Sequence, residues 1–293
     1  MGPLSVKFWG TRGLIASPRR TTAAFGGNTP CIQIQYEDQL VVVDTGFGVT
    51  NLGDALLSRI LAGERLHIHV LYTHFHWDHV QGLPFFKPIY FDQTTLSLHS
   101  PVPVETMLDN LNILFDGSYS PFESLMTMPA QINLERLVGP LTLGGLKVEY
   151  LPVDHASAAA GDTYAYKFTT PDGNAVCLIT DHEAGPTPRN RALVSFAKGV
   201  DLLIHDGQYR EDEYARHLGW GHSSINRALD NALKIGAPQT LLTHHAPWRD
   251  DDELKALRHT FANMGRYRKL AFDFAREDVV YQATRIKPLP RTA

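Results

Sequence analysis

Apolar residues recur along this chain in two periods, and each period predicts a different secondary structure. The segment 31–36 alternates apolar and polar residues, as a half-buried strand does, and 40–44 is a β-branched run that ends in a carboxylate. By the same reasoning we expect further strands at 4–9, 67–72, 89–91, 95–98, 147–153, 175–180, 201–204, 239–243 and 279–281.

Three other segments carry apolar residues at helical spacing. The stripes within 52–60, 225–233 and 254–264 each predict a helix, and a glycine follows each of them as a stop signal. The segment 104–128 is dense in Leu, Ile, Met and Phe. We expect a short helix and turn there, which either belongs to the ordinary core or covers an active site.

Four predicted strands in the second half end in histidine and aspartate. Functional side chains are often found where a rigid strand ends and a loop begins. The ends of neighbouring strands can therefore converge on one site. The four ends are Asp154–His155, Asp181–His182, His205–Asp206 and His244–His245.

The densest set of chemically active residues follows the run at 67–72. His74, His76, Asp78 and His79 lie within six residues. With this composition, chance would produce about 0.002 occurrences of that pattern per chain, so the motif is specific. In an extended loop His74, His76 and Asp78 point the same way while His79 diverges, so one loop can face two metal positions. Imidazole and carboxylate are Zn²⁺ ligands, and a catalytic site keeps one position for water.

Composition restricts the number of domains and the kinds of partner that the chain can have. The 293 residues are 43% hydrophobic and 20% charged, which suits one large globular domain or two small ones. The net charge of −4 and the pI near 6.4 argue against a dedicated nucleic-acid surface. Two cysteines are too few for a disulfide framework. Because neither a signal peptide nor a membrane-spanning apolar run is visible, we expect a cytoplasmic protein without membrane contact.

Taken together, these motifs resemble the metallo-β-lactamase-fold superfamily of dinuclear metallohydrolases, and within it the phosphodiesterase and RNase Z-like branch. The resemblance rests on His74–His79 and extends through the segments 8–13, 26–31, 43–46 and 242–247. It implies an α/β fold, a four-layer αβ/βα sandwich in which two mixed sheets are flanked by helices. It also implies one domain over 1–293, with pseudo-symmetric halves of about 1–150 and 151–293.

The family pattern also implies a ligand set for two divalent metal ions, with Zn²⁺ favoured and Mn²⁺ or Fe²⁺ allowed. The first ion would be held by His74, His76 and His155, the second by Asp78, His79 and His244, and Asp181 would bridge them. His155 is preferred to Asp154 and His244 to His245, whose supporting roles stay open. Asp44 resembles a buried support of the metal loop. Five further histidines are expected to be structural or at the surface: His67, His69, His99, His217 and His259.

Asp206 and His222 match an acid–histidine pair of the RNase Z-like branch, where the acid is usually Glu. A histidine held by a carboxylate can give a proton to a leaving oxygen. The mechanism that the resemblance implies is attack on phosphorus by a metal-bridging hydroxide, with Asp181 at the metals and with His222, oriented by Asp206, assisting the leaving alkoxide.

Three hypotheses about function follow. The first and favoured one is a phosphodiesterase for a small substrate, such as a cyclic nucleotide or cyclic phosphate, with Tyr119 and Phe122 of 104–128 available to stack on a base. The second is a metallohydrolase of a lactone or thioester, and the third a non-catalytic binding protein, against which the complete ligand set argues. An RNA 3′-processing endonuclease is disfavoured, because no basic insertion resembling the tRNA-binding arm is visible. The resemblance also allows a homodimer.

Overall fold

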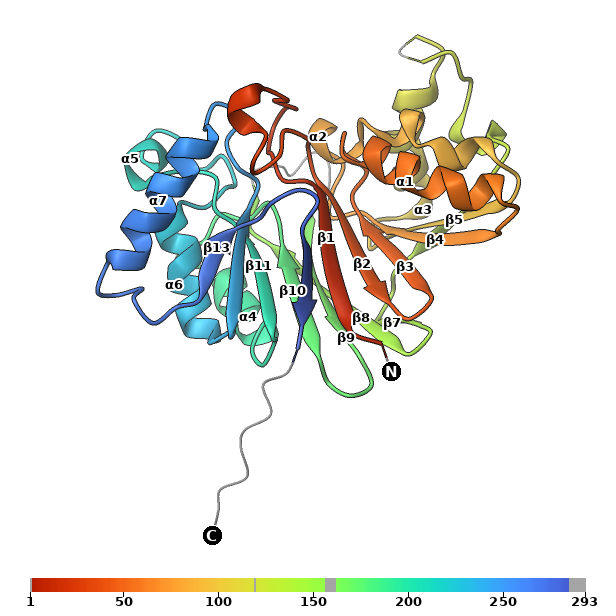
Figure 1. Ribbon diagram of the computed structural model, residues 1–293. Coiled ribbons are helices and arrows are strands. Elements are labelled where there is room, and N and C mark those ends of the chain that lie inside the picture. Colours follow the sequence, from red (N-terminus) through yellow and green to blue (C-terminus); the bar gives the residue numbers. More distant parts are fainter. Residues whose placement is uncertain (1, 119, 156–161, 285–293) are drawn as a thin grey trace.

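Two seven-stranded sheets lie face to face and carry helices on their outer sides (Figure 1). The computed structural model describes residues 2–118, 120–155 and 162–284. In spatial order, the first sheet consists of β14 (Val280–Ala283), β1 (Leu4–Gly10), β2 (Cys31–Tyr36), β3 (Gln39–Val43), β4 (Leu66–Leu71), β5 (Thr94–Ser100) and β6 (Gln131–Arg136). The second consists of β13 (Phe272–Phe274), β12 (Gln239–Thr243), β11 (Leu202–Asp206), β10 (Ala175–Ile179), β9 (Thr163–Thr169), β8 (Leu146–Val153) and β7 (Leu141–Leu143).

Both sheets are mixed and share one pattern of strand directions. In the first sheet the pairs from β14 to β3 are antiparallel and those from β3 to β6 are parallel. In the second, the pairs from β7 to β10 are antiparallel and those from β10 to β13 are parallel. The predicted four-layer α/β architecture is confirmed. The division into pseudo-symmetric halves near residue 150 stays a prediction.

Alternate side chains of a strand point to opposite faces of its sheet, one towards the other sheet and one towards the outer helices. In β3, Val41 and Val43 belong to the cluster between the sheets, whereas Leu40 and Val42 pack towards the outer helices. Both faces of such a strand are buried, which explains why its sequence is an unbroken apolar run. The first sheet carries α1 (Val49–Leu61) and α3 (Val104–Asn112) on its outer face, and the second carries α4 (Pro188–Phe196), α6 (Ile225–Ile235) and α7 (Asp251–Asn263).

The helix signals in the sequence correspond to real caps. The Ser224 side chain accepts a hydrogen bond from the Arg227 amide at the start of α6, and Gly236 ends that helix with a left-handed φ of 76°. At α7, the Asp250 side chain accepts from the Glu253 amide. The first helix, predicted from its stripe at 52–60, is α1.

Some expected elements differ. The strand predicted at 89–91 is wrong, because Lys87–Tyr90 forms a 3₁₀ turn in which Pro88 has no N–H to donate to a ladder. The strands β6, β7, β9 and β13 and the helix α4 were not anticipated. Among the described residues, no helix has the length and apolarity needed to cross a bilayer.

The segment 104–128 contributes mainly to the core beside α1. Met107, Leu111, Phe115 and Leu125 are fully buried there. Phe122 packs its ring against those of Tyr90 and Phe115, so packing is the observed use of this side chain. The other residue expected to stack on a base, Tyr119, lies outside the described residues. Whether the segment covers a substrate stays a prediction.

Candidate metal centre

The loop after β4 delivers the first four candidate ligands to the edge where parallel strands end (Figure 1). His74 lies in an irregular stretch and His76 has an extended backbone, whereas Asp78 and His79 lie in the one-turn helix α2 (Trp77–Val80). The extended-loop geometry predicted for the whole motif therefore holds only up to His76. Because the chain turns into a helix there, His79 points to a different position from His74.

Asp181 lies at the centre of the candidate ligands, directly after β10. Its Oδ2 is 3.6 Å from His74 Nε2 and 3.7 Å from His155 Nε2. Its Oδ1 is 3.2 Å from His79 Nε2 and 3.3 Å from His244 Nε2. The two oxygens of one carboxylate thus face two separate pairs of imidazoles.

The remaining candidates complete two clusters. His76 Nδ1 is 3.1 Å from His155 Nε2, which joins His76 to the His74 side. Asp78 Oδ2 is 3.5 Å from His79 Nε2 and 3.3 Å from His244 Nε2, which places it on the other side. All seven residues predicted as ligands are therefore brought together, in the groups His74–His76–His155–Asp181 and Asp78–His79–His244. A third group, Asp181–His222–His244, overlaps both and includes the histidine predicted as the acid.

The donor atoms fit divalent cations. The Nε2 atoms of His74 and His79 and the Oδ1 of Asp181 are buried and have no hydrogen-bond partner among the described residues. Such orphaned polar atoms are costly unless something else satisfies them. Imidazole nitrogens and carboxylate oxygens in tight clusters are a donor set that suits Zn²⁺, Mn²⁺ and Fe²⁺.

Charges within the cluster also suit metal binding. Burial lowers the pKa of His155 to about 4 and that of His74 well below its usual value, so both rings are neutral, the form that ligates metals. Burial alone would raise the pKa of Asp181, but His244 and His79 outweigh it and hold the pKa well below the ordinary range. Asp181 is therefore ionised.

A layer of hydrogen bonds orients the candidate ligands from behind. His79 Nδ1 is 2.8 Å from Asp44 Oδ2, and Asp44 also accepts from the amide and hydroxyl of Thr73. The buried position and contacts of Asp44 match the supporting role that the resemblance implied. His155 Nδ1 donates to the Gly221 carbonyl at 2.7 Å. Such contacts fix the ring orientation and the tautomer of a ligating histidine.

The supports of His244 and Asp78 were not anticipated. His244 Nδ1 is 2.8 Å from Gln208 Oε1, and the Leu14 amide donates to Asp78 Oδ2 at 2.8 Å. A Cβ on Gly13 would lie 2.3 Å from His244 Cε1, so only glycine fits there. The signal for Gly13 was present in the segment 8–13, whereas nothing in the sequence around Gln208 marks it.

The Asp206–His222 pair lies beside the clusters. His222 Nδ1 is 3.0 Å from Asp206 Oδ2, and the His222 ring stacks on that of His244 with centroids 4.8 Å apart. Burial alone would lower the pKa of His222, but the carboxylates of Asp206 and Asp181 outweigh it and raise the pKa to about 9. The Asp in place of the usual Glu still reaches the histidine.

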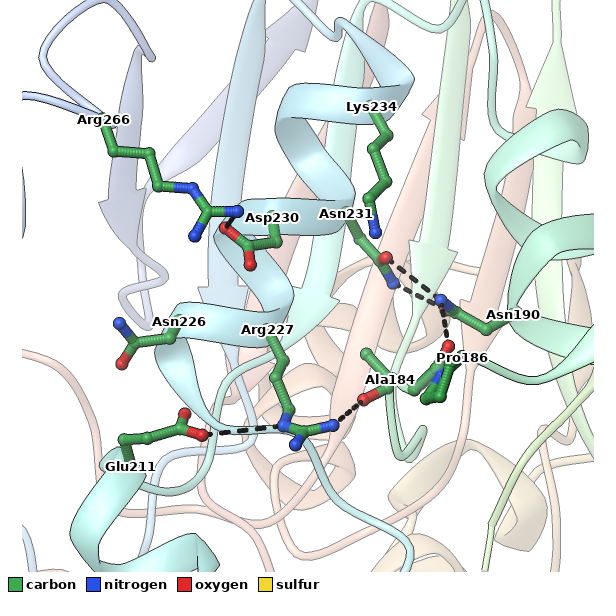
Figure 2. Close-up of a pocket in the computed structure, with 11 residues that line it drawn as sticks. Ala184, Pro186, Asn190, Glu211, Asn226, Arg227, Asp230, Asn231, Lys234 and Arg266 are labelled. Atoms are coloured by element: carbon green, nitrogen blue, oxygen red, sulfur yellow. Dashed lines mark hydrogen bonds and ion pairs between the residues drawn. The ribbon is translucent and has the colours of Figure 1, made fainter.

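Behind Asp206, a buried polar network crosses to the outer helices. His205 Nδ1 donates to the Asp206 carbonyl, Asn231 Nδ2 donates to His205 Nε2 at 3.2 Å, and Asn231 also bonds Asn190. Figure 2 shows where this network meets a cavity of about 460 Å³ between α4 and α6. Two of its three cations, Arg227 and Arg266, face Glu211 and Asp230 respectively, so these two charges are balanced locally.

Asp154 and His245, the alternatives to His155 and His244, form hydrogen bonds outside the candidate metal groups. Asp154 accepts a hydrogen bond from the Thr187 hydroxyl at the start of α4, and His245 Nε2 donates to the Ala275 carbonyl at 2.9 Å. Neither belongs to a candidate metal group among the described residues. The five histidines expected to be structural or exposed, His67, His69, His99, His217 and His259, lie outside these groups as well.

Comparisons with known proteins place this site in a family. A family model described as a β-lactamase superfamily domain matches residues 39–245. A ribonuclease Z from Porphyromonas gingivalis is 26% identical over 255 residues, which cover 73% of this chain and 81% of that relative.

Solved structures agree on the fold. A diphosphatase from the PhnP family superposes with a TM-score of 0.67 at 19% identity, over 95% of this chain and 97% of that one. The short form of human tRNase Z superposes with a TM-score of 0.62 at 18% identity, over 96% of this chain and 99% of that one. The chain therefore belongs to the β-lactamase superfamily and is a metal-dependent hydrolase of the metallo-β-lactamase fold, with relatives in its ribonuclease Z-like branch.

Proposed function

We propose that this protein is a dinuclear phosphodiesterase that cleaves a small phosphodiester, such as a cyclic nucleotide or cyclic phosphate. The observation that carries the proposal is the position of Asp181, whose two oxygens face separate imidazole pairs while His222 Nδ1 lies 3.9 Å from its Oδ2. A pair of cation positions with a buried proton donor beside them is suited to displacement at phosphorus.

In this proposal the seven candidate ligands would hold two metal ions. His74, His76 and His155 would hold one ion, Asp78, His79 and His244 the other, and Asp181 both. Two divalent ions, when bound, supply a water of lowered pKa between them and neutralise charge on the phosphoryl oxygens. Zn²⁺ is the favoured ion for this donor set, and Mn²⁺ or Fe²⁺ also suits it.

His222 is the proton donor in this proposal. Its Nδ1 is engaged by Asp206, so Nε2 is the nitrogen left to face a substrate. A proton on Nε2 would pass to the alkoxide oxygen as its bond to phosphorus breaks. Asp206 holds the ring in that tautomer and stabilises its positive charge.

Cavity size supports a small substrate. A cavity of about 560 Å³ opens beside His155 and is bordered by Glu183, Arg189, Tyr214 and Arg227. Ligand sites for small molecules commonly measure about 300–1,000 Å³. The polar border suits a nucleotide or sugar phosphate.

A substrate panel tests the proposal. Cyclic nucleotides, bis-p-nitrophenyl phosphate, a lactone, a thioester and pre-tRNA are each incubated with the protein and Zn²⁺ or Mn²⁺. We expect cleavage of the small phosphodiesters, and its loss together with metal in His76→Ala and Asp181→Ala. Turnover of the lactone or thioester alone would transfer the assignment to a non-phosphate ester hydrolase.

The role of His222 is tested separately. His222→Ala should keep both metals by elemental analysis and lose about 10²–10⁴-fold in kcat, the usual contribution of a positioned acid. His259→Ala, at an exposed position of α7, is the matched control. Loss of metal in His222→Ala would show that this histidine is a ligand and would overturn its assignment as the acid.

RNA 3′-processing is the second candidate, and the ribonuclease Z relative favours it. The net charge of −4 weighs against it, because polyanion binding usually relies on excess Lys and Arg. Cleavage of pre-tRNA with a kcat/KM above that of the small diesters would replace the first proposal by this one.

A further inference from the structure

A second cavity lies beside α2, the one-turn helix that carries Asp78 and His79. It measures about 320 Å³ and is referred to here as the α2 cavity. Its lining residues come from the loop after β3, from α2 and the turn after it, and from the segment 104–128: Phe47, Trp77, Gln81, Pro84, Phe85, Leu114 and Ser120.

Aromatic rings that solvent reaches surround this cavity. Trp77 is 55% exposed, Phe85 61% and Phe47 40%. Large apolar side chains gathered around a hollow commonly mark a binding site, whereas isolated ones are unremarkable. Trp77 lies between His76 and Asp78 in the chain, so one wall of the cavity belongs to the same segment as two candidate ligands.

One of the lining residues, Ser120, has a polar atom without a partner among the described residues. The hydroxyl of Ser120 is buried, and no hydrogen-bond partner for it exists in the described part of the chain. A buried hydroxyl without a partner costs free energy that a ligand atom could recover. The other walls of the cavity are mainly flat and apolar, which suits a planar aromatic ring.

The cavity beside His155 is bordered by charged residues, which the α2 cavity lacks. Asp154, Glu183, Arg189 and Arg227 border it, and Gly221, next to His222, does so as well. Because His222 is the proton donor in the proposed function, the leaving group belongs on that polar side. The α2 cavity is then left for the ester arm that stays on phosphorus.

We propose that the α2 cavity is a subsite for an aromatic ester arm of the substrate, a nucleobase or an aryl group, which stacks on Trp77 and Phe85. The inference rests on the proposed phosphodiesterase function and narrows its substrate to diesters with one aromatic arm. It also gives the segment 104–128 a part in binding, through Leu114 and Ser120.

The test compares two diesters that share a leaving group. 4-Nitrophenyl phenyl phosphate and 4-nitrophenyl methyl phosphate both release 4-nitrophenolate and differ only in the arm that stays on phosphorus. The measured quantity is the ratio of their kcat/KM values with Zn²⁺. We expect the ratio to fall about tenfold in Trp77→Ala and in Phe85→Ala, as loss of a stacking partner implies.

A control and a binding measurement complete the design. Trp248 is 50% exposed and lines neither cavity, so Trp248→Ala should leave the ratio unchanged. Quenching of tryptophan fluorescence by phenyl phosphate, with methyl phosphate as comparison, should weaken in Phe85→Ala. If Trp77→Ala releases metal, Phe85→Ala alone decides the outcome, because Phe85 is not adjacent to a candidate ligand.

The outcomes separate the two proposals. A wild-type protein that cleaves neither diester contradicts the phosphodiesterase function itself. Cleavage of both with an unchanged ratio in Phe85→Ala overturns the subsite alone. If Phe85→Ala instead converts a dimer to a monomer in light scattering without altering the ratio, the aromatic surface is a contact between two copies of the chain, and the subsite is again rejected.

Discussion

At the scale of single residues, two members of the site depend on a backbone conformation that side-chain-bearing residues rarely adopt. Asp44, directly after β3, has φ of 61°, and His244, directly after β12, has φ of 60°. The left-handed region costs an ordinary residue about 1–2 kcal/mol. Strain of this kind persists where surrounding contacts enforce it, and it gathers at functional sites.

Asp44 provides a clean test because asparagine also tolerates that conformation. Three donors point at its carboxylate, two from Thr73 and one from His79. An amide has one oxygen, so Asp44→Asn forces an N–H against at least one of these donors. We expect metal affinity to fall about 10–100-fold, measured by competition with a chelating dye.

The control for this substitution is Asp38→Asn at the exposed turn between β2 and β3, which should bind metal as the wild type does. An unchanged affinity in Asp44→Asn would show that Asp44 serves only the fold.

Gly13 tests how closely the chain packs behind His244. An added methyl group would lie 2.3 Å from His244 Nδ1 and 2.8 Å from Gln208 Oε1, so Gly13→Ala must displace the ring. A displacement near 1 Å commonly costs about 100-fold in rate, which is the loss we expect in kcat/KM. The substituted protein should also lose metal from the Asp78–His79–His244 group.

Gly139→Ala is the matched control, because its added methyl group meets no atom within 4 Å. Full activity in Gly13→Ala would mean that the loop at 10–14 yields without affecting His244.

At the scale of elements, the strands β4, β5 and β6 bring a row of histidines together away from the metal centre. His69 Nδ1 is 3.1 Å from His99 Nε2, and Glu135 lies 3.5 Å from His99. The His67 ring is tilted against that of His69, with centroids 4.1 Å apart. Burial, with smaller contributions from His67 and His99, lowers the pKa of His69 to about 4. Burial also lowers the pKa of His99, against the opposing charge of Glu135.

This row predicts acid sensitivity. Between pH 6.5 and 4 the unfolded chain takes up a proton at His69 that the folded chain refuses, so the free energy of unfolding falls as the pH falls. His69→Gln should reduce the slope of stability against pH by up to about one proton over that window. Urea denaturation at several pH values measures it. An identical slope in His69→Gln would mean that His69 titrates normally in the folded chain.

The secondary-structure elements that were predicted from the sequence are more deeply buried than most of those that were missed. The strands β3, β10 and β11 are buried on both faces, so their apolar runs stand out in the sequence. β6 is an edge strand without a fully buried residue, and β13 has three residues. In α4 the buried positions are Asn190 and Leu193, so polar bonds hold it and no apolar stripe marks it.

At the scale of the whole molecule, the candidate site joins the two sheets. The loop after β4 belongs to the first sheet, whereas His155, Asp181 and His244 follow strands of the second. Spacing and family resemblance indicated seven residues that the fold brings together, and their role as ligands stays a prediction. They could not reveal Gln208 or the fit of Gly13 against His244, because those contacts exist only once segments far apart in the chain have met.

Because the site joins both sheets, metal removal should weaken the whole fold. Ligand binding to the native state stabilises it by about 4 kcal/mol when the free metal is about 1,000 times its Kd. We therefore expect the chelated protein to melt several degrees below the Zn²⁺-loaded protein in calorimetry. The difference should shrink in His76→Ala. Equal melting temperatures with and without chelator would contradict a metal role in stability.

The position of the candidate ligands at strand ends also bears on how such a protein can diversify. Three candidate ligands, His155, Asp181 and His244, lie within two residues of a strand end, whereas Phe85, a wall of the α2 cavity, lies on a connecting segment well beyond β4. A substitution at such a wall position changes the shape offered to an ester without replacing a candidate ligand. Selection can then alter substrate preference one loop at a time, while the reactive centre is inherited intact.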